Sequence, residues 1–200
     1  MVNLEPARKA LEKNIAEPIV RFLSRTRITP NAVTWIGFGI TVIAGALAFT
    51  EHLLAAGIVV LVAGIFDMLD GTLARNTKRV TKFGAVLDST LDRVSEALVL
   101  LGLLAVFVRD AHVTESMLVG FALLGSFLTS YTRARMEGLG IECKAGLFTR
   151  PERVIVTAAG LIFSWINYVL LIALVIVLIF SWYTTFERMA YARRILKTRE

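Results

Sequence analysis

Long apolar runs separated by short polar segments dominate the chain from position 32 onward. A helix needs about 20 apolar residues to cross a hydrocarbon core of roughly 30 Å. The pattern predicts six transmembrane helices, over residues 32–50, 53–75, 83–108, 114–137, 151–166 and 168–187. The last two form one apolar stretch that is too long for a single span, so we expect a turn at Ser164-Trp165-Ile166-Asn167. The predicted fold is therefore an all-α integral membrane protein.

The first 28 residues have a different pattern, because they are charged throughout and lack the apolar central region of a signal peptide. Apolar residues at helical spacing share one face, namely Leu4, Leu11, Ile15, Ile19 and Phe22. This periodicity predicts an amphipathic helix in the headgroup plane, interrupted near Pro18, and a polar tether is the alternative. We expect three parts: a surface arm over 1–30, a six-helix domain over 31–190 and a basic cytoplasmic tail over 191–200.

Composition and charge support this reading and add an orientation. Hydrophobic residues make up 56% of the chain and charged residues 19%, which excludes both a soluble globule and a disordered chain. The net charge of +6 would by itself be compatible with nucleic-acid binding. However, 21 of the 22 basic residues fall in the segments on one side of the predicted spans, and only Arg109 falls on the other. Cytoplasmic loops retain Lys and Arg, so we expect both termini to be cytoplasmic and no nucleic-acid partner.

Four aspartates lie inside the predicted spans, where a charge costs at least about 2.5 to 3.5 kcal/mol at the helix centre. Asp67 and Asp70 are near the cytoplasmic end of the second span, and Asp88 and Asp92 are near the cytoplasmic start of the third. Spacings of three and four residues place each pair on one helix face. We expect all four carboxylates to meet at one shallow depth that is open to the cytosol.

Carboxylates crowded in a low-dielectric site repel one another unless cations neutralise them. Oxygen ligands without nearby His or Cys favour Mg²⁺ or Mn²⁺, and two such ions can hold a diphosphate. Gly71 and Gly84 leave space beside the acids, and Arg75 offers a fork for phosphate oxygens. The residues alone leave two alternatives open: a proton or ion relay in a small transporter, and salt bridges to Arg75 and Arg93.

The residues of this region form a pattern of eight fixed positions within 26, Asp67-x2-Asp70-Gly71-x2-Ala74-Arg75-x8-Gly84-x3-Asp88-x3-Asp92. The pattern resembles the complete signature of the CDP-alcohol phosphotransferase family, with no spacing changed. The resemblance implies transfer of a phosphatidyl-type group from a CDP-linked lipid to an alcohol, with release of CMP and dependence on Mg²⁺ or Mn²⁺. It also implies six spans, a cytoplasmic active site and an N-terminal surface helix, in a protein that is often a homodimer.

The resemblance further implies a role for each motif residue. It assigns a two-ion site to Asp67, Asp70, Asp88 and Asp92. It assigns the pocket for cytidine and diphosphate to Gly71, Ala74, Arg75 and Gly84. Asp92 would also be the base that accepts the proton of the acceptor hydroxyl, and this agrees with the chemistry, because an alcohol is a weak nucleophile.

The acceptor region is less specific. Two segments, Ser130-Tyr131-Thr132-Arg133-Ala134-Arg135 and Arg150-Pro151-Glu152-Arg153, resemble the prokaryotic phosphatidylinositol-phosphate synthase branch of the family, which includes archaeal enzymes. The resemblance implies that Arg133, Arg153 and Arg188 hold the phosphate of inositol 1-phosphate. Ordinary positive-inside charge is the alternative for each of them, and it is the reading that we favour for Arg135, Arg150, Arg193 and Arg194.

We therefore expect a transferase of the prokaryotic cytoplasmic membrane that joins CDP-diacylglycerol or CDP-archaeol to inositol 1-phosphate. A phosphatidylglycerophosphate synthase that uses glycerol 3-phosphate is the nearest alternative. A carboxylate-based transporter and a prenyltransferase with Asp-bound Mg²⁺ are alternatives from other classes. The Asp-Gly and Ala-Arg spacings argue against both of the latter.

Overall fold

The computed structural model describes residues 17–24, 26, 28–143 and 145–197, and all regular elements in these ranges are helices. They are α2 (Glu17–Leu23), α3 (Pro30–Phe49), α4 (Leu53–Asn76), α5 (Lys82–Arg109), α6 (Val113–Gly138), α7 (Arg150–Ile162) and α8 (Val169–Lys197). The predicted all-α membrane class is confirmed, because several of these helices are long and apolar.

The helices differ in their suitability to cross a membrane. Four of them, α3, α4, α6 and α8, have the length and hydropathy of membrane spans. Helix α5 has 28 residues, but Asp88, Asp92, Arg93 and Glu96 lie within its first 15. Helix α7 has 13 residues, about 20 Å at 1.5 Å per residue, so it is shorter than the predicted span over 151–166. The structure thus supports a multi-pass membrane protein in which α5 and α7 are the atypical helices.

The end of the chain follows the predicted course with one difference. The expected turn after the fifth apolar segment is confirmed, since α7 ends at Ile162, α8 begins at Val169, and Tyr168 has a φ of 66°. Helix α8 then continues to Lys197, ten residues beyond the predicted end of the last span. The segment expected as a basic tail is therefore helical as far as Lys197.

Only part of the N-terminal arm lies within the described residues. Helix α2 buries Val20 in an apolar cluster with Leu69 and Leu73 of α4. Ile19 and Phe22, two residues of the predicted apolar face, are exposed, Phe22 to 72%. This exposure is compatible with a helix that contacts lipid. Leu4, Leu11 and Ile15, the other members of that face, lie outside the described residues.

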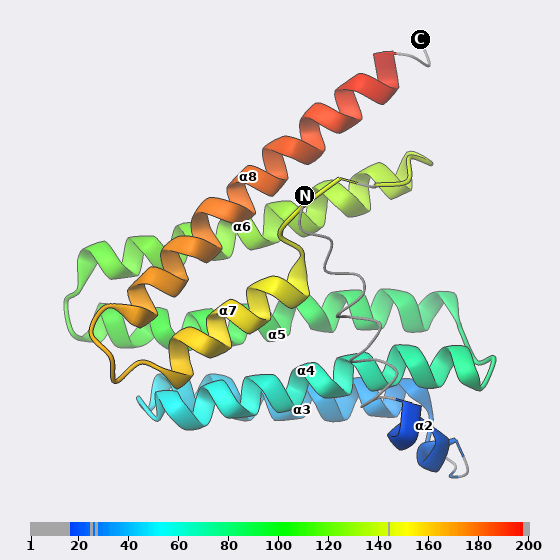
Figure 1. Cartoon of the computed structure of the whole chain (residues 1–200), viewed down its shortest axis with the longest axis horizontal. Helices are drawn as coiled ribbons and strands as arrows, with labels where there is room; N and C mark the ends of the chain where they lie inside the picture. Colours follow the sequence, from blue (N-terminus) through cyan, green and yellow to red (C-terminus); the bar gives the residue numbers. More distant parts are fainter. Residues whose placement is uncertain (1–16, 25, 27, 144, 198–200) are drawn as a thin grey trace.

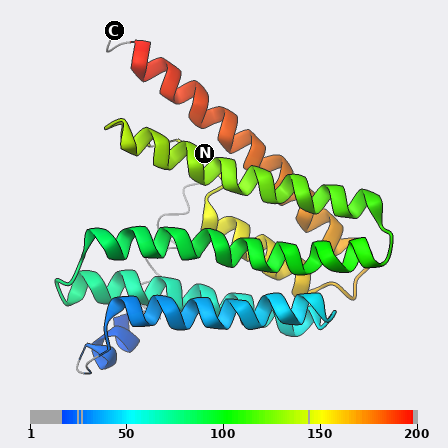
Figure 2. The same cartoon turned by 180° about the vertical axis from the view of Figure 1, so that it is seen from behind.

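The helices alternate in direction, so that the starts of α3, α5 and α7 and the ends of α4, α6 and α8 point towards one end of the bundle (Figure 1). Helix α3 packs between α4 and α5, and α7 packs between α4 and α8. Helices α6 and α8 pair with each other and lie on one side of the bundle, with α3 and α5 side by side below them in the reverse view (Figure 2). This arrangement brings the motif segments of α4 and α5 to the same end as the arginine-bearing start of α7.

Small residues allow the helices to approach closely. A Cβ atom at Gly102 of α5 would lie 2.6 Å from the carbonyl oxygen of Gly45 in α3. A Cβ atom at Gly57 of α4 would lie 2.8 Å from the carbonyl oxygen of Ala158 in α7. Apolar burial gives little drive for helix association in lipid, so tight backbone packing of this kind carries much of the stability. The two contacts fix α5 and α7 against the α3–α4 pair.

Substituting Gly102 by alanine tests this packing. The added methyl group would overlap the backbone of α3, and we expect a loss of about 1–3 kcal/mol of stability, measured as a lower midpoint of thermal unfolding in detergent. Gly120→Ala is the matched control, because a Cβ atom there meets nothing within 4 Å and alanine favours the helix. Equal midpoints for the two variants would contradict the packing argument.

Candidate active site

Asp67 of α4 and Asp92 of α5 lie on opposite sides of one guanidinium group. Arg150 Nη2 is 2.7 Å from Asp67 Oδ2, and Arg150 Nη1 is 2.8 Å from Asp92 Oδ1. All three side chains are about one-fifth exposed. Asp70 and Asp88 lie within electrostatic reach of Asp67. The expectation that the four aspartates gather in one place is therefore consistent with the structure, and Arg150 stands between two of them.

Asp70 is the most deeply buried of the four. Its side chain is 5% exposed, and Oδ2 has no hydrogen-bond partner among the described residues. Buried carboxylate oxygens require donors or cations, so this atom lacks a partner that a bound ion would supply. Mg²⁺ and Mn²⁺ prefer such oxygen-only surroundings. The donor chemistry of the four aspartates therefore fits divalent ions.

The carboxylates are not, however, arranged around an ion. Within the described part of the chain, no three acidic, His or Cys side chains converge closely enough to hold a metal ion. The positive charge between Asp67 and Asp92 comes from Arg150, which the sequence suggested to be ordinary positive-inside charge. That interpretation of Arg150 was wrong. The alternative of salt bridges to Arg75 and Arg93 also named the wrong arginines for these two aspartates, since Arg93 donates to the Ser89 carbonyl oxygen.

The expected CDP-lipid residues lie around the same helix ends. Gly71 follows Asp70, and a Cβ atom there would lie 3.4 Å from Arg75 Nη1. Arg75 Nη2 donates to Thr72 Oγ1 at 3.1 Å, and Ala74 is half-buried. Gly84 lies in the first turn of α5, where a Cβ atom would lie 3.1 Å from Asn31 Oδ1. Gly84 thus permits close packing against the start of α3, a structural role that the sequence did not indicate.

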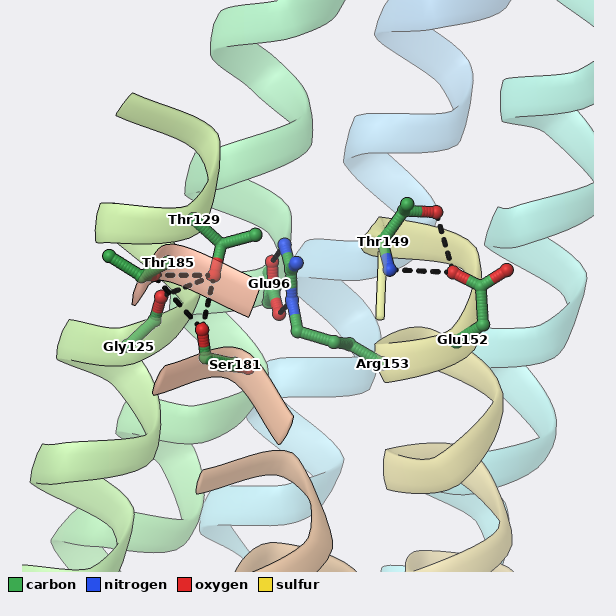
Figure 3. A network of polar contacts seen from close by, with 8 residues as sticks. All are labelled: Glu96, Gly125, Thr129, Thr149, Glu152, Arg153, Ser181 and Thr185. Carbon is green, nitrogen blue, oxygen red and sulfur yellow. Dashed lines mark hydrogen bonds and ion pairs between the residues drawn. The ribbon is translucent and has the colours of Figure 1, made fainter. Parts of the chain in front are cut away.

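Arg153 forms a buried ion pair with a residue that the sequence analysis did not select. Its side chain is 1% exposed, and it donates to Glu96 through Nε at 2.6 Å and Nη2 at 2.8 Å (Figure 3). Glu96 follows Asp92 by one turn of α5, so the two share a helix face. This i, i+4 spacing is the signal that could have identified Glu96. Bidentate pairing fixes the position of the Arg153 guanidinium beside the aspartates.

The start of α7, which carries Arg150 and Arg153, is itself fixed by local hydrogen bonds. Thr149 and Glu152 form a capping box, in which the Thr149 amide donates to Glu152 Oε2 at 2.8 Å (Figure 3). Pro151 follows in the first turn, where its fixed φ suits the helix. The Thr-Arg-Pro-Glu-Arg sequence thus holds two arginines on the first turn of a helix that begins inside the bundle.

Arg188 of α8 is held by backbone carbonyl groups. Its guanidinium donates to the carbonyl oxygens of Thr129 and Ala145. Gly146 has a φ of +123°, and a Cβ atom there would lie 2.8 Å from Arg188 Nε, so glycine is required at this position. The Thr129 hydroxyl also bonds to the Ser181 carbonyl oxygen and the Thr185 hydroxyl, which ties α6 to α8 (Figure 3). Arg188 is therefore positioned by α6, α8 and the loop before α7.

Arg133 of α6 completes the expected acceptor set. It is half-exposed and pairs with Glu137 one turn later, with Nε 2.8 Å from Oε1. Both Arg133 and Arg153 lie within electrostatic reach of Arg188. The structure thus brings the three expected arginines into one region, two of them buried and one exposed.

The Glu96–Arg153 pair has a measurable consequence for stability. In Glu96→Ala the Arg153 charge would be buried without its partner, and we expect a loss of about 3–5 kcal/mol, seen as a large drop in the unfolding midpoint. Glu137→Ala removes the same type of group from an exposed pair with Arg133 and should change stability by about 0–1 kcal/mol. Similar midpoints for the two variants would show that Glu96 does not neutralise Arg153.

Comparison with known proteins matches residues 27–193 to the sequence model of the CDP-alcohol phosphatidyltransferase family. The chain is 37% identical to an archaetidylinositol phosphate synthase from Pyrococcus horikoshii over 92% of this chain and 94% of the relative. It is 39% identical to a phosphatidylinositol phosphate synthase from Mycobacteroides abscessus over 75% of this chain and 69% of the relative.

Solved structures give the same result. The crystal structure of a Mycobacterium tuberculosis phosphatidylinositol phosphate synthase with CDP-DAG bound matches with a TM-score of 0.81 and 32% identity, over 89% of this chain and 93% of that chain. The structure of the same enzyme in complex with manganese and citrate matches with a TM-score of 0.80 and 33% identity, over 89% of this chain and 88% of that chain. The motif, the fold and the relatives agree, and the chain belongs to the CDP-alcohol phosphatidyltransferase family.

Proposed function

We propose that this protein transfers a phosphatidyl-type group from CDP-diacylglycerol or CDP-archaeol to inositol 1-phosphate, with release of CMP. The observation that carries the acceptor assignment is the gathering of Arg133, Arg153 and Arg188 in one region, with Arg153 paired to Glu96 one turn after Asp92. A phosphate monoester is a suitable partner for such a cluster, since guanidinium groups bind its oxygens in pairs. Relatives named phosphatidylinositol or archaetidylinositol phosphate synthase support the same acceptor.

In the proposed reaction, the acceptor hydroxyl oxygen forms a bond to the lipid-side phosphorus of the CDP-lipid. The bond from that phosphorus to the bridging oxygen breaks, and CMP leaves with the electron pair. Asp92 accepts the hydroxyl proton. It lies one turn before Glu96, which pairs with Arg153 of the proposed acceptor site, so it is the site aspartate of α5 nearest to the bound acceptor. Arg75, Gly71, Ala74 and Gly84 form the side on which the cytidine and diphosphate bind.

Two divalent ions, Mg²⁺ or Mn²⁺, would be held by Asp67, Asp70, Asp88 and Asp92. When bound, they would neutralise the negative charge that develops on the leaving diphosphate. Asp70 Oδ2, which has no partner among the described residues, supports divalent metal binding at this site, and the manganese complex of the M. tuberculosis enzyme supports use of such an ion.

The proposal includes a membrane arrangement. We infer six spans, with α5 and α7 crossing beside the four typical ones, and an active site and both described chain ends facing the cytoplasm of a prokaryote. Charges in α5 and α7 are compatible with this arrangement because Asp92, Glu96, Arg150 and Arg153 face one another and not lipid. We also propose a homodimer, on the family resemblance.

Release of CMP from purified protein in detergent tests the activity directly. With CDP-diacylglycerol and Mn²⁺, we expect CMP only when inositol 1-phosphate is added. CMP release with glycerol 3-phosphate and none with inositol 1-phosphate would show that glycerol 3-phosphate is the acceptor. Release of inorganic diphosphate, or no reaction with any CDP-lipid, would contradict the proposal as a whole.

Replacing Asp92 by asparagine tests the general base. The amide keeps the shape but accepts no proton at neutral pH, so we expect kcat to fall by about 10²- to 10⁴-fold. Asp110→Asn is the matched control, since Asp110 is an exposed aspartate at the opposite end of α5 that contacts Arg109. The unfolding midpoint of each variant separates loss of chemistry from loss of fold. Wild-type turnover in Asp92→Asn would remove the residue from the mechanism.

Arg133 offers the cleanest test of acceptor binding, because its side chain is exposed and its removal leaves no buried group without a partner. We expect Arg133→Ala to raise KM for inositol 1-phosphate by about tenfold with a smaller change in kcat and in KM for the CDP-lipid. Arg135 is also exposed and lies two residues later in α6, so Arg135→Ala should leave both KM values unchanged. Equal effects of the two substitutions would indicate a general charge effect.

A further inference from the structure

Arg150 occupies a position that the family signature does not include. It is the only described basic residue within ion-pair distance of Asp67 or Asp92, and it contacts both through separate nitrogen atoms. One guanidinium brings a single positive charge to a site with four carboxylates. The site therefore keeps an excess of negative charge that a divalent ion would reduce further.

The contacts of Arg150 also leave part of its side chain unsatisfied. Its Nε atom is buried without a hydrogen-bond partner among the described residues, whereas Arg153, one turn later, uses Nε in its pair with Glu96. Arg150 is thus held by fewer of its donors than its position in the bundle would allow. Arg150 also borders a small cavity lined by Ser95, Glu96 and Thr157.

The guanidinium occupies Asp67 Oδ2 and Asp92 Oδ1, so a divalent ion that used these same two oxygens would compete with it. An ion bound by Asp67 and Asp92 needs their oxygens at roughly 2.0–2.1 Å for Mg²⁺, whereas Arg150 now lies between these side chains at hydrogen-bond distance. Two cations at such close range repel each other strongly where the local dielectric is low. An ion that takes these two oxygens would displace the arginine.

We propose that the Arg150 guanidinium is an exchangeable internal cation of this site, which neutralises Asp67 and Asp92 while no metal is bound and leaves when a divalent ion enters. The inference rests on the proposed function, because it takes these aspartates to be metal ligands. Arg150 is thus a positioning residue that keeps the two carboxylates together before metal binding.

Removal of the competing cation should tighten metal binding. We expect Arg150→Gln to lower the Mn²⁺ dissociation constant, measured by calorimetric titration of the detergent-solubilised protein, by about tenfold or more. Without metal, the same variant should unfold at a lower temperature than wild type, so Mn²⁺ should raise its midpoint by a larger interval. A residue with only a structural role would weaken metal binding or leave it unchanged.

Arg93→Gln is the matched control, because Arg93 has the same charge and lies within electrostatic reach of Asp88 and Asp92 but donates to the Ser89 carbonyl oxygen instead. We expect it to change the dissociation constant by less than about threefold. An equal increase in Mn²⁺ affinity in the two variants would mean that the effect comes from long-range charge alone, and it would overturn the proposal. An unchanged or weaker constant in Arg150→Gln would do the same while leaving the CMP-release test unaffected. No Mn²⁺ binding by wild type would overturn both the metal site and this inference.

A measurement on wild-type protein avoids any folding defect of the variant. Phenylglyoxal modifies accessible arginine side chains, and peptide mass spectrometry locates the product. Saturating Mg²⁺ should accelerate modification at Arg150 by several-fold, because its ion pairs are lost, and should leave Arg109 at the opposite end of α5 unchanged. Equal or slower modification of Arg150 with Mg²⁺ would overturn the proposal.

Discussion

Carboxylates held close together inside a membrane bundle repel one another, and the surrounding structure supplies cations and donors that offset this repulsion. Asp67 and Asp92 come from two helices and share one guanidinium, while Asp70 has a buried oxygen without a described partner. The arrangement is stable only with compensating charge nearby. The short helix α7 provides that charge, since its first turn carries Arg150.

Positive charge near the site is in turn held in place by other groups. Glu96 pairs with Arg153 through two hydrogen bonds, and the carbonyl oxygens of Thr129 and Ala145 hold Arg188. The first contact joins α5 to α7, and the second joins α6, α8 and the loop before α7. Preorganised arginines lose less side-chain freedom when they bind an anion. The same contacts that secure the bundle therefore prepare the region proposed for the acceptor.

The sequence was informative where spacing alone specifies geometry. Two pairs of aspartates at three- and four-residue intervals, on adjacent spans with opposite directions, placed the site at one end of the bundle. The turn near Ser164 followed from the limit on span length. The start of α7 was predicted to within one residue, but its end was placed four residues too far, because apolar residues of the turn continue the same hydrophobic run.

Charge was harder to interpret. Positive-inside arginines and site arginines look alike in a sequence. Only the tertiary contacts distinguish Arg150 from exposed arginines such as Arg135. Glu96 carried a usable signal, because it continues the Asp88 and Asp92 stripe by another turn. The need for glycine at position 146 could not be predicted from the sequence, since it depends on a contact with Arg188 of α8.

The short length of α7 determines where the two kinds of substrate meet. Its first residue pairs with Asp67, which lies nine residues, about 14 Å, before the last residue of α4. Arg150 at the start of α7 therefore lies well below the end of the neighbouring helix α4. A water-soluble sugar phosphate would descend between the helix ends to reach the arginines of α7, while the lipid tails of the donor stay in the bilayer. In such a protein the acceptor phosphate would reach the donor headgroup without any acyl chain being lifted into water.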